Sequence, residues 1–230
     1  MSDLVRAAYR DPALLVRSTR AIEDMICGLS ADLGLSAREV GALVLRMPTL
    51  ASMRAATVVS NVTTLAGLLG VDVTDAARCA LRMPQLLYLR PDGVAGKLRV
   101  VSEKLSIPLP EVAAAVLRMP TLAGRDPAAV AHKVRLCVRI SAALGRDASP
   151  GDILKGQPAV TTYGMDRLLL RWLAAKIGIW TGGWTSLVIM SDRKLLARFE
   201  EHYESLGPQS REAARLRALV SRRMRADVRP

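Results

Sequence analysis

Basic residues recur at a nearly constant interval along this chain. Arg46, Arg82 and Arg118 lie 36 residues apart, and Lys155 follows 37 residues later. Each stands two or three residues before a proline. A nucleic-acid duplex presents a dense line of phosphates, so cations repeated along a protein are suited to contact it. A cation at the end of a helix can also offset the helix dipole and bond to free carbonyls, and both roles stay open here.

A second set of cations recurs in the segments between these prolines. Lys97 and Lys133 lie 36 residues apart, and Arg171 follows 38 residues later. Arg99 and Arg135 repeat the 36-residue interval. These five side chains are further candidates for contact with phosphates, which gives affinity without sequence preference. An ordinary solvated helix face is the alternative interpretation of this set.

The residues from position 211 to the end of the sequence form a third basic segment. It holds seven arginines, among them Arg222 and Arg223, against only Glu212 and Asp227 as acids. Interspersed leucine and valine give it a partial apolar side, so we expect a basic amphipathic helix with a frayed end. Nucleic acid is the favoured partner of this segment, and a membrane surface or solvent are the alternatives.

The chain as a whole is basic and has no pattern typical of catalysis. It contains 33 Lys and Arg against 21 Asp and Glu, a formal net charge of +12, which attracts polyanions. It shows no Ser-His-Asp or Cys-His set, no paired-carboxylate signature and no Gly-rich phosphate loop. Its two histidines, His132 and His202, belong to no metal-ligand pattern. We therefore expect no enzymatic activity, no cofactor and no metal site.

A tetrapeptide recurs at the same interval as the first set of cations. Leu-Arg-Met-Pro occurs at residues 45–48, 81–84 and 117–120. Degenerate copies lie 36 residues upstream, around Pro12, and 38 residues downstream, around Pro158. Because the residue before a proline is pushed out of the α region, each copy is expected to end a helix. A repeat of this length is typical of stacked helical units that share one elongated core.

Each unit is predicted to contain a short helix before the proline and a longer helix after it. The short helix begins at a capping signal, as at Ser36 with Glu39. Its apolar residues have helical spacing, and in one unit they are Val40, Leu43, Val44 and Met47. The apolar residues of the longer helix in the first three units are Ile22, Ile26, Leu29 and Leu33; Val58, Val62, Leu65 and Leu69; and Val94, Leu98, Val101 and Leu105. Glycines that mark helix ends are Gly34, Gly70, Gly145 and Gly178.

The cysteines and the hydropathy pattern indicate the compartment. Cys27, Cys79 and Cys137 are far apart within apolar helical patterns, and we expect reduced core residues in a reducing environment. The first residues lack a basic segment followed by an apolar run, so we expect no signal peptide. No stretch of about 18 uncharged apolar residues is present, so we expect no membrane span.

The repeat resembles that of the mitochondrial transcription termination factor (mTERF) family. The resemblance is carried by the Leu-basic-apolar-Pro step, the apolar pair after it, and the leucine-spaced helix closing at Leu-Gly-Leu-Ser. The clearest copy runs from Leu33 to Leu50, and the resemblance extends over roughly residues 5–196. The short chain, with about five recognisable units, suggests a short bacterial-type or divergent member of this family.

The resemblance implies a fold and a function. The implied fold is a superhelical half-ring of three-helix units, in which the third helix is short and 3₁₀-like. The implied function is binding of double-stranded DNA or structured RNA along a basic concave face, in transcription, its termination or ribosome assembly, without catalytic residues.

Together these observations predict an all-α solenoid of about five helical repeats, with a period of about 36 residues, that forms a curved superhelix. We expect the array over residues 1–196, with Trp180 and Trp184 covering its last unit, and a basic helical cap or tail over residues 197–230. The predicted function is nucleic-acid binding in transcription or its regulation, and a scaffold for an acidic peptide or helix is the alternative. We expect a monomer, nucleoid-associated in the cytoplasm if bacterial, or in the organelle matrix if eukaryotic.

Overall fold

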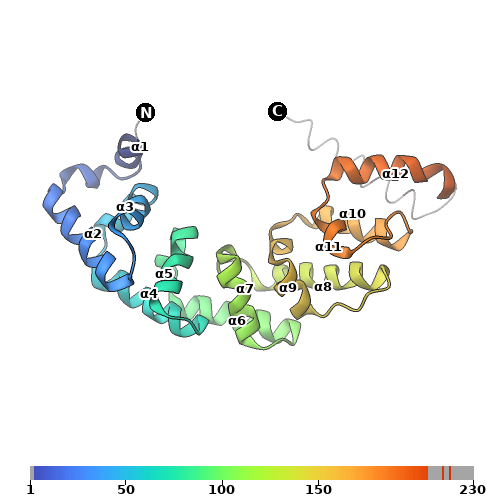
Figure 1. The fold of residues 1–230 in the computed structure, drawn as a ribbon, viewed down its shortest axis with the longest axis horizontal. Coiled ribbons are helices and arrows are strands. Elements are labelled where there is room, and N and C mark those ends of the chain that lie inside the picture. The colour runs from blue at the N-terminus through green and yellow to red at the C-terminus, as the bar shows by residue number, and fades with distance from the viewer. Residues whose placement is uncertain (1–2, 207–213, 215–217, 219–230) are drawn as a thin grey trace. The chain divides into compact units, whose positions relative to one another are not determined.

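A computed structural model describes residues 3–206, Ala214 and Ala218. The described residues form twelve α-helices and five short 3₁₀ helices and contain no strand (Figure 1). The elements in chain order are α1 (Asp3–Arg10), η1 (Pro12–Val16), α2 (Thr19–Leu33), α3 (Ala37–Arg46), η2 (Pro48–Ser52), α4 (Ala55–Leu69), α5 (Val73–Arg82), η3 (Pro84–Leu87), α6 (Pro91–Leu105), α7 (Leu109–Arg118), η4 (Pro120–Gly124), α8 (Pro127–Ala143), α9 (Pro150–Gly156), η5 (Pro158–Thr162), α10 (Met165–Lys176), α11 (Trp184–Ile189) and α12 (Asp192–Leu206).

The elements form five repeats of the same kind. Each repeat contains a short α-helix, a 3₁₀ helix and a longer α-helix, beginning with α1–η1–α2 and ending with α9–η5–α10. The predicted all-α class, the five helical repeats and the short 3₁₀ element are therefore confirmed.

A proline opens each 3₁₀ helix and ends the short helix before it. The residues directly before three of these prolines, Met47, Met83 and Met119, have φ angles of −140°, −134° and −138°. This backbone lies outside the α region, because the proline ring disfavours that region at the preceding residue. The proline itself has no amide hydrogen to donate, so it suits the first position of the turn that follows.

Glycines in the left-handed conformation follow the longer helices, as the sequence predicts. Gly34, Gly70, Gly145 and Gly178 have φ angles of 63°, 68°, 69° and 77°. Ser106 lies 36 residues after Gly70 and takes the same conformation with a φ of 54°. The left-handed region is unfavourable for a residue with a Cβ atom, so this repeat carries strain that the others avoid.

The predicted apolar stripes form the core. In α4 the four stripe residues are at most 5% exposed, and the same holds for the stripe in α6. In α2 the pattern is less complete, since Leu29 and Leu33 are buried but Ile22 and Ile26 are only half-buried. The apolar stripe is therefore less completely buried in the first repeat than in the two that follow.

The described residues divide into two compact units. The first contains residues 3–99 and 112–125, and the second contains residues 100–111 and the described residues from 126 onward. In the first unit α1 contacts α3, η1 contacts η2, and η4 contacts both α5 and η3. In the second unit α8 contacts α9, η5, α10 and α11.

Residues after the last repeat pack against it within the second unit. The Trp184 ring lies 3.8 Å from the place that a Cβ atom would occupy at Gly156 in α9. The Trp180 indole donates a hydrogen bond to the Gly183 carbonyl at 3.2 Å, and the guanidinium of Arg198 lies 4.7 Å from the Trp180 ring centre. The expected boundary between residues 196 and 197 falls inside α12, so it is not a break in secondary structure.

Candidate nucleic-acid interface

Two of the predicted cations bond to backbone carbonyls of the following repeat. Nη1 of Arg46 donates a hydrogen bond to the Leu81 carbonyl at 2.6 Å. Nη1 of Arg82 donates to the Arg118 carbonyl at 3.4 Å, and its Nη2 donates to the Leu117 carbonyl. In both cases the acceptor lies in the last turn of the next short helix.

Arg10 extends this pattern one repeat upstream, because its Nη1 donates to the Arg46 carbonyl at 3.4 Å. The last carbonyls of a helix have no partner within that helix, so each of these bonds satisfies an acceptor that would otherwise need water. Because donor and acceptor belong to successive repeats, each bond also joins two units of the stack. We call Arg10, Arg46 and Arg82 the junction arginines. Capping was one of the two predicted roles, and the capped carbonyls belong to the next repeat.

The junction bonds leave the guanidinium groups accessible. Arg46 and Arg82 are exposed, and so is Arg118 at the same position of the next repeat. A guanidinium carries five N–H donors, so one or two bonds to carbonyls leave donors for another ligand. Capping and contact with a phosphate are therefore compatible at these positions.

Lys155 is exposed in the last turn of α9. Its neighbour one turn earlier is Asp152, the acidic member of a capping box with Ser149. The Ser149 hydroxyl and backbone amide hold the pKa of Asp152 below its ordinary value, and the charge of Lys155 adds to this effect. Lys155 therefore stands at an exposed helix end close to Asp152.

The second set of cations is less accessible than the first. Lys97 is half-buried, and Lys133 is half-buried with its Nζ donating to the Thr161 carbonyl at 3.0 Å. Arg99 is exposed. Arg135 is exposed and donates through Nη2 to the Lys104 carbonyl. Only part of this set can meet a ligand without rearrangement.

Arg171 is a buried structural residue, and the prediction that it contacts a polyanion is wrong. Its side chain has no exposed surface and forms an ion pair with Asp192. Its Nη1 donates to the Arg167 carbonyl at 3.1 Å, and its Nη2 donates to the Met190 carbonyl at 2.5 Å. Elements after the last repeat bury this position, since Met190 follows α11 and Asp192 begins α12.

A comparison with protein families decides the identity of the repeat. The model of the family described as mTERF matches residues 1–120, more than half of the 230 residues. The chain belongs to the mTERF family. This family generally binds nucleic acid, acts in transcription termination and is not enzymatic. None of the curated proteins searched gives a significant match to the chain.

The mTERF architecture continues beyond the matched residues. The match ends at Pro120, the first residue of η4. The elements α8, α9, η5 and α10 follow it in the same order as in the earlier repeats. The second unit thus contains a further repeat of the mTERF kind that the shorter match does not reach.

Two of the predicted interface residues, Arg222 and Arg223, lie outside the residues that the structure describes. Within the described ranges, no group of three or more His, Cys, Asp or Glu side chains could hold a metal ion. No single described helix is long and apolar enough to span a membrane; α4 and α5 pass that test only as a pair bent by 104°.

The arginines of the last mTERF repeat form a cluster that the sequence did not indicate. Nη2 of Arg167 lies 3.3, 3.3 and 3.1 Å from the carbonyls of Val188, Ile189 and Met190, at the C-terminal end of α11. Its guanidinium also lies 4.4 Å from the centre of the Tyr163 ring. These contacts join α10 to elements outside the repeat, so no repeated spacing could have signalled them.

Proposed function

We propose that this mTERF chain binds double-stranded DNA or structured RNA through a basic groove and acts in transcription or its termination. The observation that supports this proposal best is the exposure of Arg46, Arg82 and Arg118. They occupy one repeat position, at the C-terminal ends of α3, α5 and α7, and all three lie in the first unit. Cations repeated in this way match a polymer whose phosphates are also repeated.

The junction bonds favour this role energetically. A free arginine side chain loses rotamer freedom when it binds, and that loss weakens binding. Arg46 and Arg82 are already held by carbonyls of the next repeat, so less freedom remains to be lost. Contacts to phosphate fix position and carry no sequence information, so we expect weak discrimination among duplex sequences.

Further exposed cations extend the proposed interface in each unit separately. Arg99 adds to the first unit, and Arg135 and Lys155 belong to the second. Lys97 and Lys133 would contribute only after their side chains leave their half-buried positions. We propose that the protein acts as a monomer, located with its nucleic acid in the bacterial nucleoid or in an organelle matrix.

Fluorescence anisotropy with labelled duplex DNA and a labelled RNA hairpin tests the proposal. At about 0.1 M salt, we expect Arg118→Gln to weaken binding by about eightfold, because one fewer counterion is released. Arg20→Gln is the matched control, since it removes one exposed charge from α2 at a position where the later repeats carry no cation. The proposal is contradicted if neither the duplex nor the hairpin binds at low salt, or if the two variants weaken binding equally.

The cellular role is tested separately by crosslinking in cells and sequencing of the bound nucleic acid. A role in transcription or its termination predicts enrichment of transcribed regions or of transcript ends. Recovery of unrelated sequences in proportion to their abundance contradicts that part of the proposal.

A further inference from the structure

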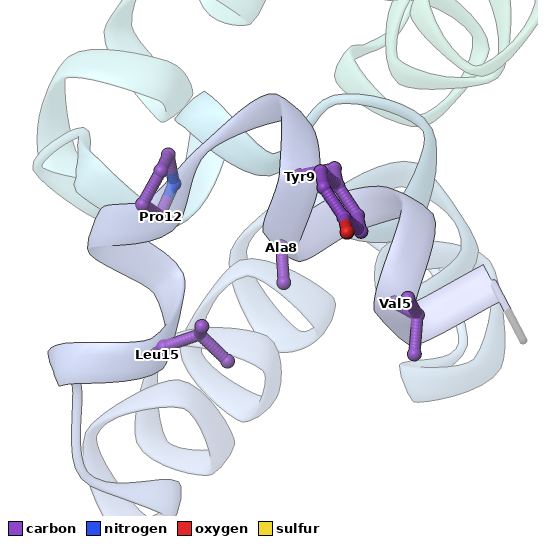
Figure 2. A pocket seen from close by; sticks show the side chains of 5 residues that line it. All are labelled: Val5, Ala8, Tyr9, Pro12 and Leu15. Atoms are coloured by element: carbon purple, nitrogen blue, oxygen red, sulfur yellow. The ribbon is translucent and has the colours of Figure 1, made fainter.

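The first repeat carries an apolar groove of about 450 Å³ on its surface. It is lined by Val5, Ala8, Tyr9, Pro12 and Leu15, which come from α1 and η1 (Figure 2). Tyr9 is 79% exposed and Leu15 is 72% exposed. Four of the seven large apolar side chains exposed among the described residues lie between positions 5 and 16. Clustered apolar exposure of this kind marks interaction surfaces.

Three of the five positions that line the groove are buried in every later repeat of the first unit. Ala8 corresponds, at intervals of 36 residues, to the buried residues Val44, Ala80 and Val116. Pro12 corresponds to the buried residues Pro48, Pro84 and Pro120. Leu15 corresponds to the buried residues Ala51, Leu87 and Ala123. The groove is therefore made mostly of positions that serve elsewhere as a contact surface between repeats.

The element that covers these positions is the preceding short helix with its proline turn. Helix α1 lies against α3 and η2, and η1 lies against η2. Helix α5 and η3 lie against η4 in the same way. Between these two pairs of repeats, Arg46 in α3 donates a hydrogen bond to the Leu81 carbonyl in α5. A helix-and-turn segment is thus the structure that fits this surface.

The carbonyl groups at the end of α1 favour a partner that carries a positive charge. The junction arginines donate to the carbonyls of Arg46, Leu81, Leu117 and Arg118. At intervals of 36 residues, the corresponding carbonyls in α1 belong to Tyr9 and Arg10. A partner that lies on α1 as the repeats lie on one another would place a cation at these carbonyls.

We propose that this groove binds a helix-and-turn segment of another protein, with small or branched apolar side chains along one side, a basic residue in its last turn and a proline after it. A second copy of this chain fits less well. Its segments of this build in the first unit, such as α3–η2 and α5–η3, already contact the following repeat. The net charge of +12 also opposes self-association.

A peptide with the sequence of residues 36–53 of this chain is a direct probe, because it contains the capping box, Arg46 and the proline turn. It is used free and also tethered by a Gly/Ser linker ahead of Met1 of the full chain, since a tether supplies a millimolar effective concentration. Anisotropy reports binding of the free peptide, and slower amide hydrogen exchange in α1 and η1 reports binding of the tethered one.

The expected result is saturable binding that depends on the groove. Leu15→Glu is expected to weaken it at least about tenfold, because a charge replaces an apolar contact. Ile189→Glu is the matched control, because Ile189 is 51% exposed in the other unit and its substitution should leave binding unchanged. In the peptide, Arg46→Gln is expected to weaken binding by about fivefold, the worth of one hydrogen bond.

Two outcomes overturn the inference. The first is an absence of Leu15-dependent binding in both the free and the tethered formats. The second is dimerisation of the full chain alone, seen by sedimentation and abolished by Leu15→Glu, since the occupant would then be a second copy.

Discussion

The three cysteines show how far a helical pattern specifies the surroundings of one residue. Cys79 and Cys137 are buried as expected, whereas Cys27 is exposed, so the expectation of a core position is wrong there. Cys27 stands beside Ile26 at the edge of the α2 stripe, and that helix buries only Leu29 and Leu33. Burial raises the pKa of the Cys137 thiol to about 12. Burial also raises the pKa of Cys79, against the opposing charge of Arg82.

These environments predict the order of thiol reactivity. At pH 8 in the folded protein, a maleimide reagent should modify Cys27 rapidly and leave Cys79 and Cys137 unmodified, because only the thiolate reacts. Mass spectrometry of the labelled protein measures the site, and Cys27→Ser should abolish the fast phase. Equal labelling rates at all three positions in native buffer contradict this picture.

The capping box at the start of α3 predicts a pH dependence. Hydrogen bonds from the Ser36 hydroxyl and backbone amide hold the pKa of Glu39 below its ordinary value. A lowered folded pKa means that the bond stabilises the fold above the unfolded-state pKa and that this stabilisation is lost as the pH falls through the folded pKa.

Ser36→Ala should therefore move the pKa of Glu39 upward and destabilise the protein more at pH 7 than at pH 3. Titration by nuclear magnetic resonance and urea unfolding at both pH values measure the two effects. The variant Ser149→Ala is the parallel case for Asp152 in α9. An unchanged Glu39 titration in Ser36→Ala would rule out the capping explanation.

At the scale of the element, the end of each longer helix is a repeated structural position with one exception. Gly34, Gly70 and Ser106 lie 36 residues apart and share the left-handed conformation. A Cβ atom at Gly70 would meet no other atom within 4 Å, so only backbone strain opposes a side chain there.

This position predicts opposite effects for two substitutions. Ser106→Gly should stabilise the protein by about 1 kcal/mol, because it removes a Cβ atom from a left-handed residue. Gly70→Ala should destabilise it by about 1 kcal/mol for the same reason. Thermal unfolding of both variants measures the difference. Destabilisation by Ser106→Gly would show that the serine side chain matters more than the strain.

The junction arginines predict a stability effect separate from charge. Arg82→Gln should destabilise the protein by about 1 kcal/mol, the net worth of a hydrogen bond, because it releases the Leu117 and Arg118 carbonyls. Arg78→Gln removes the same charge from an exposed pair on the same helix and should change stability by less than about 0.5 kcal/mol. Urea unfolding compares them. A similar cost for both would mean that the junction bonds add no stability.

At the scale of the whole molecule, the repeat was the most predictable feature. Leu-Arg-Met-Pro at a fixed interval specified the repeat length, the prolines that end the short helices and the register of the buried stripes. These features depend on neighbouring residues along the chain, so a single sequence contains them. The fit is poorest at the end of the repeats, where residues after the last repeat bury Arg171.

The candidate interface was less predictable than the fold. Repeat position identified Arg46, Arg82 and Arg118, but it could not show that two of them bond to the next repeat. Such bonds join residues 35 or 36 positions apart and depend on how the units stack. The Arg171–Asp192 pair has no repeated counterpart, so periodicity gave no signal for it.

The salt dependence of binding to duplex DNA tests the central claim most directly. If Arg46, Arg82 and Arg118 each neutralise one phosphate, the plot of log K against log salt concentration has a slope of about −2.7 or steeper. Arg118→Gln should make this slope shallower by about 0.9. Arg20→Gln should leave the slope unchanged. A wild-type slope near zero on both duplex DNA and the RNA hairpin, or one that Arg118→Gln does not alter, contradicts the account.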